Sequence, residues 1–124
     1  MKKFLICFLL LFLSFTLYGC DSKEEVISDD NINVEEKMNN VMKTDNYIIV
    51  DVRTADEYSE GHVVGAINIP YDQINENTDL DKSKTIMVYC RSGKRSGVAY
   101  STLKDLGYDV LDLGAYESIN LDKE

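Results

Sequence analysis

The chain has 124 residues and a formal net charge of −9, with 22 acidic side chains against 13 basic ones. That length accommodates a single domain. The acidic surplus excludes nucleic acid and anionic membrane surfaces as binding partners, because both carry negative charge.

The first 19 residues predict a signal peptide rather than a part of the domain. Lys2 and Lys3 give a short basic start, and an almost uninterrupted apolar run follows. The run is shorter than the roughly 20 residues that a membrane-spanning helix takes, which favours a signal peptide. The leader contains no acidic residue, so its removal leaves 22 acidic and 11 basic side chains.

The end of this leader, LYGC (Leu17–Cys20), resembles a bacterial lipobox. In that signal, cleavage falls before the cysteine, and a diacylglycerol is attached to its sulfur. Tyr18 stands where a small residue is usual, and the alternative is an uncleaved N-terminal anchor. In both cases we expect the domain to be held at the outer face of the cytoplasmic membrane, on the periplasmic side in a cell with two membranes.

Residues 20–31 are predicted to hold the lipidated cysteine and an acidic tether, and the folded domain is expected over residues 32–124. With Cys7 removed and Cys20 lipidated, Cys90 is the one free thiol. An unpaired cysteine outside the cytoplasm indicates a reactive thiol, and the alternative is a buried, inert one. An unmodified Cys20 would allow a disulfide with Cys90 and a redox-gated protein.

Helical and strand-like segments alternate along the domain. Asn33, with Glu36 three residues later, predicts a capping box before a helix. Gly107 fits the C′ position of a later helix, with Tyr108 packing on Leu103 as in a Schellman motif. The predicted elements, in chain order, are a helix with its apolar face at Val34, Met38, Val41 and Met42, a strand over Tyr47–Val52, a short helix over 55–60 ending at Gly61, a strand over 65–70, a polar connection over 72–83 with one helical turn, a strand over 85–90, a helix from about Ser96, a strand over 108–113 and a short closing segment over 115–119.

Two continuous apolar runs, Tyr47–Val52 and Thr85–Cys90, have the length and the β-branched content of strands buried on both faces of a parallel sheet. Strands that alternate with helices indicate an α/β architecture with a parallel sheet. Cys90 then lies at the carboxyl end of a central strand and just before a helix, which is where open α/β sheets bind ligands.

The stretch CRSGKRS that begins at Cys90 predicts an activated thiol. The N-terminus of the following helix attracts an anion, and Gly93 permits a tight turn in which backbone N–H groups converge. The side chains of Arg91, Lys94 and Arg95 add positive charge. All these features favour the thiolate, so we expect a lowered pKa for Cys90 and nucleophilic character near neutral pH.

Two reaction classes use such a loop: phosphoryl transfer through a cysteinyl phosphate and sulfur transfer through a persulfide. Cysteine phosphatases resemble C-x5-R, where the arginine fork holds the phosphate. Counted from Cys90, that position is Ser96, and Arg95 lies one place too early. The shorter loop favours a single sulfur atom over a tetrahedral oxyanion.

The loop resembles the active-site loop of single-domain rhodaneses. The stretch Ile48–Pro70, IIVDVRTADEYSEGHVVGAINIP, is similar to a second rhodanese signature, and DLGAYESI resembles the C-terminal element of the family, with Ile119 where a tryptophan is frequent. The resemblance covers about residues 31–121. It implies a rhodanese-like three-layer α/β fold, with a central, mostly parallel sheet and helices on both faces.

The resemblance also implies an enzyme in which Cys90 takes a sulfane sulfur from an anionic donor such as thiosulfate and passes it to cyanide or a thiol. No metal and no organic cofactor is implied, and a thiolate that attacks sulfur needs no general base. The alternatives are a non-catalytic sulfur carrier or binding module and, less favoured, a cysteine phosphatase or an arsenate reductase. The residues implied to bind the donor and the persulfide are Arg91, Ser92, Gly93, Lys94, Arg95 and Ser96.

Other signature residues predict structural roles. Asp51 and Arg53 end the first strand near the same sheet edge, and we expect an ion pair that braces the loops rather than catalytic groups. His62 is expected to be a hydrogen-bonding residue of a turn, with a proton shuttle as the alternative. For Glu57 and Tyr58 we expect helix packing and charge pairing.

Overall fold

A sheet of four parallel strands organises the computed structural model, which describes residues 33–124. The predicted signal peptide, the lipid attachment site at Cys20 and the acidic tether lie outside the described residues. The strands are β1 (Tyr47–Asp51), β2 (Ile67–Asn68), β3 (Thr85–Cys90) and β4 (Asp109–Ala115), in the spatial order β2-β1-β3-β4.

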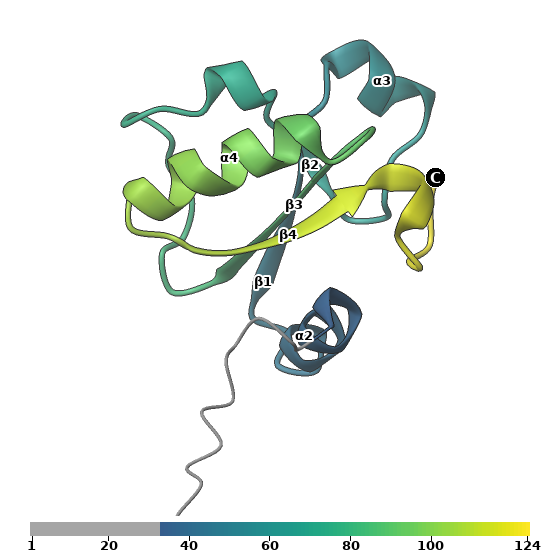
Figure 1. Ribbon diagram of the computed structural model, residues 1–124, viewed down its shortest axis with the longest axis horizontal. Coiled ribbons are helices and arrows are strands. Elements are labelled where there is room, and N and C mark those ends of the chain that lie inside the picture. Colours follow the sequence, from purple (N-terminus) through teal and green to yellow (C-terminus); the bar gives the residue numbers. More distant parts are fainter. Residues whose placement is uncertain (1–32) are drawn as a thin grey trace, which may run out of the picture. The chain divides into compact units, whose positions relative to one another are not determined.

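Helices cover both faces of this sheet. Figure 1 shows α4 on one side of the strands and α2 on the other. Within the described range, no helix has the length and apolar character that a membrane crossing requires. The helices are α2 (Val34–Met42), α3 (Ala55–Glu60) and α4 (Lys94–Asp105), with single 3-10 turns η2 (Tyr71–Gln73) and η3 (Tyr116–Ser118).

The alternation of side chains along a strand builds one core on each face. Successive residues of β1 and β3 point to opposite sides of the sheet, so one set packs beneath α4 and the other packs against α2. This arrangement confirms the predicted three-layer α/β fold. The α4 side holds Val50 and Val88 with Ala99 and Leu103, and the α2 side holds Ile49 and Met87 with Met38.

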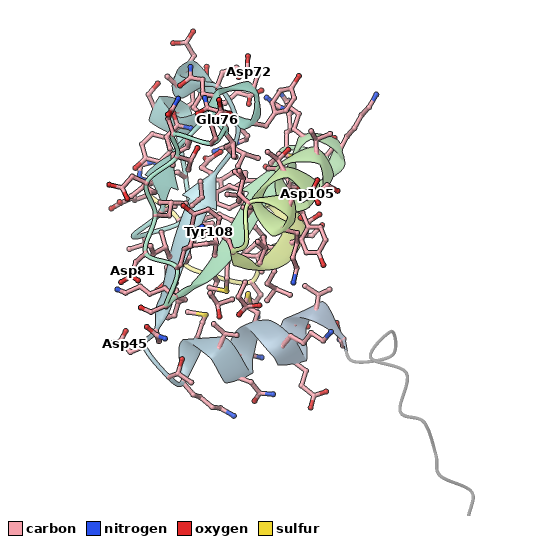
Figure 2. The ribbon with its side chains drawn as sticks, turned by 90° about the vertical axis from the view of Figure 1, so that its left-hand side faces the viewer. Asp45, Asp72, Glu76, Asp81, Asp105 and Tyr108 are labelled. Carbon is pink, nitrogen blue, oxygen red and sulfur yellow. The ribbon has the colours of Figure 1, made fainter. Side chains whose placement is uncertain are left out.

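The end of α4 confirms the predicted Schellman motif. Gly107 has φ +91°, its N–H donates to the carbonyl of Lys104, and the N–H of Tyr108 donates to that of Leu103. The hydroxyl of Tyr108, which is labelled in Figure 2, donates to the carbonyl of Thr78 at 2.8 Å. This bond ties the long connection before β3 to the end of α4.

Two element boundaries and one helix cap differ from the predictions. The helix α4 begins at Lys94, two residues early, because its first turn is polar and gives no apolar periodicity. The strand β2 has two residues rather than six, because it pairs at the sheet edge and ends before Pro70, which has no N–H. Asn33 caps α2 through the N–H of Glu35, one position before the one that a capping box uses.

The strand β4 continues two residues beyond its predicted end. A register shift beside Val88 and Tyr89 aligns Gly114 with Tyr89 and Ala115 with Cys90. Gly114 has φ +79°, a conformation that glycine adopts without a steric penalty. Gly114 is therefore part of a β-bulge that carries the chain past the cysteine.

The acidic side chains labelled in Figure 2 are spread over the described domain. Asp72 and Glu76 lie near one end in that view, Asp45 and Asp81 lie near the other, and Asp105 projects from α4. The negative surplus is therefore distributed over the surface.

Candidate active site

Cys90 is the last residue of β3, and α4 begins four residues later at Lys94. The loop between them, Arg91–Gly93, lies at the carboxyl end of a central parallel strand, where sheets of this class bind ligands. Cys90 has no exposed surface, whereas Arg91 and Ser92 are exposed. The sulfur therefore lies at the bottom of a short loop.

Hydrogen-bond donors converge on the sulfur of Cys90. The N–H of Gly93 donates to Sγ at 3.0 Å. Burial raises the pKa of Cys90, but hydrogen bonds from the side chain and N–H of Ser96 and from the N–H groups of Gly93 and Ser92 outweigh it, so this pKa lies below its ordinary value. The arrangement stabilises the thiolate, which is the nucleophilic form of cysteine.

Gly93 makes this geometry possible. It has φ +92° and caps the N-terminus of α4, so the chain turns from strand to helix within three residues. A β-carbon on Gly93 would lie 3.6 Å from the α-carbon of Gly114, in ordinary contact. The positive φ, rather than a lack of space, is thus the reason that glycine suits this position.

The basic side chains near the cysteine have different surroundings. Arg91 and Lys94 are exposed, whereas Nη2 of Arg95 lies 3.1 and 3.0 Å from the two carboxylate oxygens of Glu57. Glu57 thus has the charge-pairing role that the sequence suggested. From the sequence we expected these cations to contribute to the lowered pKa of Cys90. In the structure, the largest contributions that lower this pKa are hydrogen bonds.

Asp51 and Arg53 form the expected ion pair, and it is buried. Nη2 of Arg53 lies 2.7 Å from Oδ2 of Asp51 and 2.6 Å from the carbonyl of Gly61. Asp51 also accepts the hydroxyl proton of Tyr89 at 2.8 Å, and that hydroxyl accepts the N–H of Val63. This network joins β1 and β3 to the turn after α3, and burial raises the pKa of Tyr89, so its phenol stays neutral.

His62 is held on both ring nitrogens. Nδ1 lies 2.9 Å from the carbonyl of Tyr58, and Nε2 lies 3.1 Å from Oε1 of Glu124. The ring stacks on Tyr58 with 3.8 Å between centroids. These contacts confirm the prediction that His62 is a hydrogen-bonding residue of the turn.

A surface cavity adjoins the cysteine loop, and most of its lining could not be predicted from the sequence. It is formed by the start of the loop, by the region of α3 and by η3, three segments that are far apart in the sequence. One feature of the sequence could have brought two of these segments together. Arg91 directly follows β3 and η3 directly follows β4, and the carboxyl ends of parallel strands lie at the same edge of the sheet. The lining residues are Arg53, Glu57, Glu60, Gly61, Arg91, Tyr116 and Glu117.

Ser96 occupies the position that an arginine fork would need for phosphate. It is fully buried in the first turn of α4, and its hydroxyl donates to the carbonyl of Gly93 at 3.0 Å. Arg95, the neighbouring cation, is paired with Glu57.

The described residues also contain no group of three His, Cys, Asp or Glu side chains placed to hold a metal ion.

These features define an α/β domain with a buried cysteine thiol in a short loop whose N–H groups are directed at the sulfur. A family model described as a rhodanese-like domain matches residues 34–120, and the chain belongs to the rhodanese family. A solved structure of an Escherichia coli rhodanese with anions is similar, with a TM-score of 0.58 and 35% identity over 63% of this chain and 96% of that one.

Curated relatives include sulfurtransferases and a proposed sulfur carrier. The thiosulfate sulfurtransferase PspE of Escherichia coli is 38% identical over 60% of this chain and 75% of its own length. The thiosulfate:glutathione sulfurtransferase of Saccharomyces cerevisiae is 31% identical over 77% of this chain and 80% of its own. The proposed sulfur carrier YrkF of Bacillus subtilis is 31% identical over 73% of this chain, which spans about half of that protein.

Proposed function

We propose that this protein is a sulfurtransferase that moves a sulfane sulfur from a small anionic donor such as thiosulfate, through a persulfide on Cys90, to cyanide or a thiol. The observation that carries the proposal is the sulfur of Cys90, which accepts the N–H of Gly93 and has a lowered pKa. Membership in a family that includes thiosulfate sulfurtransferases supports the same chemistry.

In the first step, the Cys90 thiolate attacks the outer sulfur of thiosulfate. A bond forms between Sγ and that sulfur, the sulfur–sulfur bond of thiosulfate breaks, and sulfite leaves with the electron pair. The negative charge then lies on the outer sulfur of the persulfide, where the converging loop N–H groups stabilise it. An acceptor attacks this sulfur in the second step, and the electron pair of the broken bond returns to Sγ.

Access to the sulfur requires a local movement. Cys90 has no exposed surface, so a donor reaches Sγ only when the exposed residues Arg91 and Ser92 shift. The guanidinium of Arg91 is the nearest cation along the chain and attracts the anionic donor to this point.

The mass of the full chain tests the proposal. We expect thiosulfate to add one sulfur atom to Cys90, and cyanide to remove it with release of thiocyanate. The Cys90→Ser variant controls for Cys7 and Cys20 and should gain no sulfur. Loading without release to any acceptor would favour a sulfur carrier instead. No loading from thiosulfate or polysulfide, with hydrolysis of a phosphate ester, would favour the phosphatase alternative.

We further propose that a lipid on Cys20 anchors the domain at the outer face of the cytoplasmic membrane. The proposal is supported by the lipobox-like sequence Leu17–Cys20 and the apolar leader before it. In cells fed an alkyne-labelled fatty acid, the full chain should acquire the label, and the Cys20→Ala variant should not. Label on the variant, or on neither protein, would contradict the lipid anchor.

A further inference from the structure

The cavity beside the cysteine loop has a mixed charge that the proposed reaction with thiosulfate does not explain. One wall is Arg91, the residue after the nucleophile. Two other segments, α3 and η3, contribute the carboxylates of Glu57, Glu60 and Glu117 to the lining. Thiosulfate is a dianion, and carboxylates near its path oppose its binding, so this lining suits another reactant.

Ion pairing inside the protein leaves only part of this charge available to a ligand. Arg53 is bound to the buried Asp51 at 2.7 Å, and Glu57 is bound to Arg95 at 3.0 Å. Arg91, Glu60 and Glu117 are exposed. The cavity therefore presents one exposed cation, on the residue that follows Cys90, and two exposed carboxylates, from α3 and η3.

The aromatic ring that lines the cavity, Tyr116, is held by contacts within the protein. The guanidinium of Arg53 lies 4.3 Å from the centroid of the Tyr116 ring, and Nζ of Lys123 lies 4.8 Å from it. Gly61 brings the backbone close to the Tyr116 hydroxyl, since a β-carbon there would lie 3.1 Å from that oxygen. The ring is thus held by contacts that do not depend on a ligand.

We propose that this cavity binds the sulfur acceptor, and that the acceptor is a small zwitterionic thiol, with its ammonium group toward Glu60 and Glu117 and its carboxylate toward Arg91. This inference rests on the proposed sulfurtransferase function and names the class of its second substrate. Cysteine is the simplest thiol with both groups. Charge complementarity at both ends orients such a molecule, whereas cyanide and uncharged thiols gain no such contacts.

The transfer itself needs no further reactant. The acceptor thiol attacks the outer sulfur of the Cys90 persulfide, a new sulfur–sulfur bond forms, and the bond to Sγ breaks. The electron pair stays on Sγ as the thiolate, and the thiol proton remains with the persulfide product. Arg91 lines the cavity and is the residue after Cys90 in the chain, so a carboxylate held by its guanidinium brings the thiol toward the loop.

Single-turnover transfer from the loaded full chain tests this proposal without a contribution from donor binding. The protein is loaded with thiosulfate, freed of it, and mixed with cysteine, cysteamine, 3-mercaptopropionate or 2-mercaptoethanol at equal thiolate concentrations. These thiols carry both charges, the ammonium alone, the carboxylate alone and neither. The readout is the ratio of each second-order rate constant to that of 2-mercaptoethanol.

We expect the ratio for cysteine and cysteamine to fall about three- to tenfold in the double variant Glu60→Gln, Glu117→Gln, with no fall for 3-mercaptopropionate. Arg91→Ala should lower the ratio for cysteine and 3-mercaptopropionate and spare cysteamine. Glu76→Gln, which changes an exposed carboxylate outside the cavity, is the matched control and should leave every ratio unchanged.

The outcomes separate this inference from the proposed function. Transfer to cyanide together with unchanged thiol ratios in the double variant overturns the zwitterionic acceptor and leaves the sulfurtransferase standing. A wild-type chain that passes sulfur to neither cyanide nor any thiol overturns both. A fall in the cysteine ratio that high salt abolishes supports the charged contacts.

Discussion

The carboxyl ends of two neighbouring parallel strands are built in opposite ways. At the end of β1, Asp51 and Arg53 satisfy each other, with further bonds to Tyr89 and the carbonyl of Gly61. At the end of β3, the donors of the loop converge on a single sulfur, and the cations beside it include the exposed Arg91.

This difference separates a structural polar cluster from a reactive one. The groups at the end of β1 are buried and bonded to one another, so their hydrogen bonds are satisfied within the protein and stabilise the fold. The donors at the end of β3 are directed at the sulfur of Cys90, so they stabilise its thiolate and, in the proposed reaction, its persulfide. Both ends have charged residues, and only the contacts distinguish their roles.

The largest effect is expected from Cys90→Ser, which removes the thiol at the end of β3. We expect sulfur transfer from thiosulfate to cyanide to fall to the background rate, because the hydroxyl is a poor nucleophile toward sulfur, while the near-isosteric change leaves the fold intact. Thiocyanate release and far-UV circular dichroism measure the two properties. Transfer that persists in this variant would exclude a Cys90 persulfide.

At the end of β1, a substitution is expected to change the free energy of unfolding. Asp51→Ala should lower the free energy of unfolding by about 3–5 kcal/mol, because it leaves the guanidinium of Arg53 buried without its partner. Denaturant unfolding of the full chain measures this loss. Asp79→Ala removes an exposed carboxylate and is expected to stay within about 0.5 kcal/mol of the parent protein. Equal effects of the two substitutions would show that the buried network contributes little.

Gly93→Ala affects both stability and chemistry. The φ of +92° should cost roughly 1–2 kcal/mol of stability for a residue with a β-carbon, and the shifted N–H should weaken its bond to Sγ and slow the transfer. Gly65→Ala is the matched control, since Gly65 has φ +82° and open space around it. We expect the control to lose similar stability and keep its transfer rate.

Much of the fold could be predicted because its signals are local. The apolar runs of β1 and β3 gave the buried parallel strands, and Gly107 with Tyr108 gave the end of α4. The end of β4 was missed because Gly114 gives the same local signal in a turn and in a β-bulge. Only the pairing with β3 decides between them.

The candidate site was predictable only where one segment builds it. Cys90 and Gly93 lie in one short loop, so their spacing indicated a thiolate in a cradle of N–H groups. The cavity carboxylates Glu60 and Glu117 come from α3 and η3, and no local pattern shows that they line the same space as Arg91. The ion pair between Arg95 and Glu57 could not be predicted from the sequence either, because the two residues are far apart in the chain.

The smallest expected effect concerns the pH dependence of the reaction. The thiolate of Cys90 exists above its pKa, so kcat/KM for thiosulfate should rise with pH through that value and fall as the pH is lowered through it. Hydrogen bonds from Ser96 hold this pKa below its ordinary value, and Ser96→Ala should move the midpoint of the profile to higher pH while leaving the plateau nearly unchanged.

The hydroxyl of Ser96 has one hydrogen, which it gives to the carbonyl of Gly93 in the structure, and a thiolate competes for it as a charged acceptor. Ser101→Ala is therefore the matched control, because the hydroxyl of Ser101 donates to the carbonyl of Gly97 on the same helix and lies away from the sulfur. We expect the control to keep the parent midpoint. A common shift of the midpoint in both variants would assign the effect to helix α4 as a whole. A shift in Ser96→Ala alone would show that one buried hydroxyl helps to lower the pKa of Cys90.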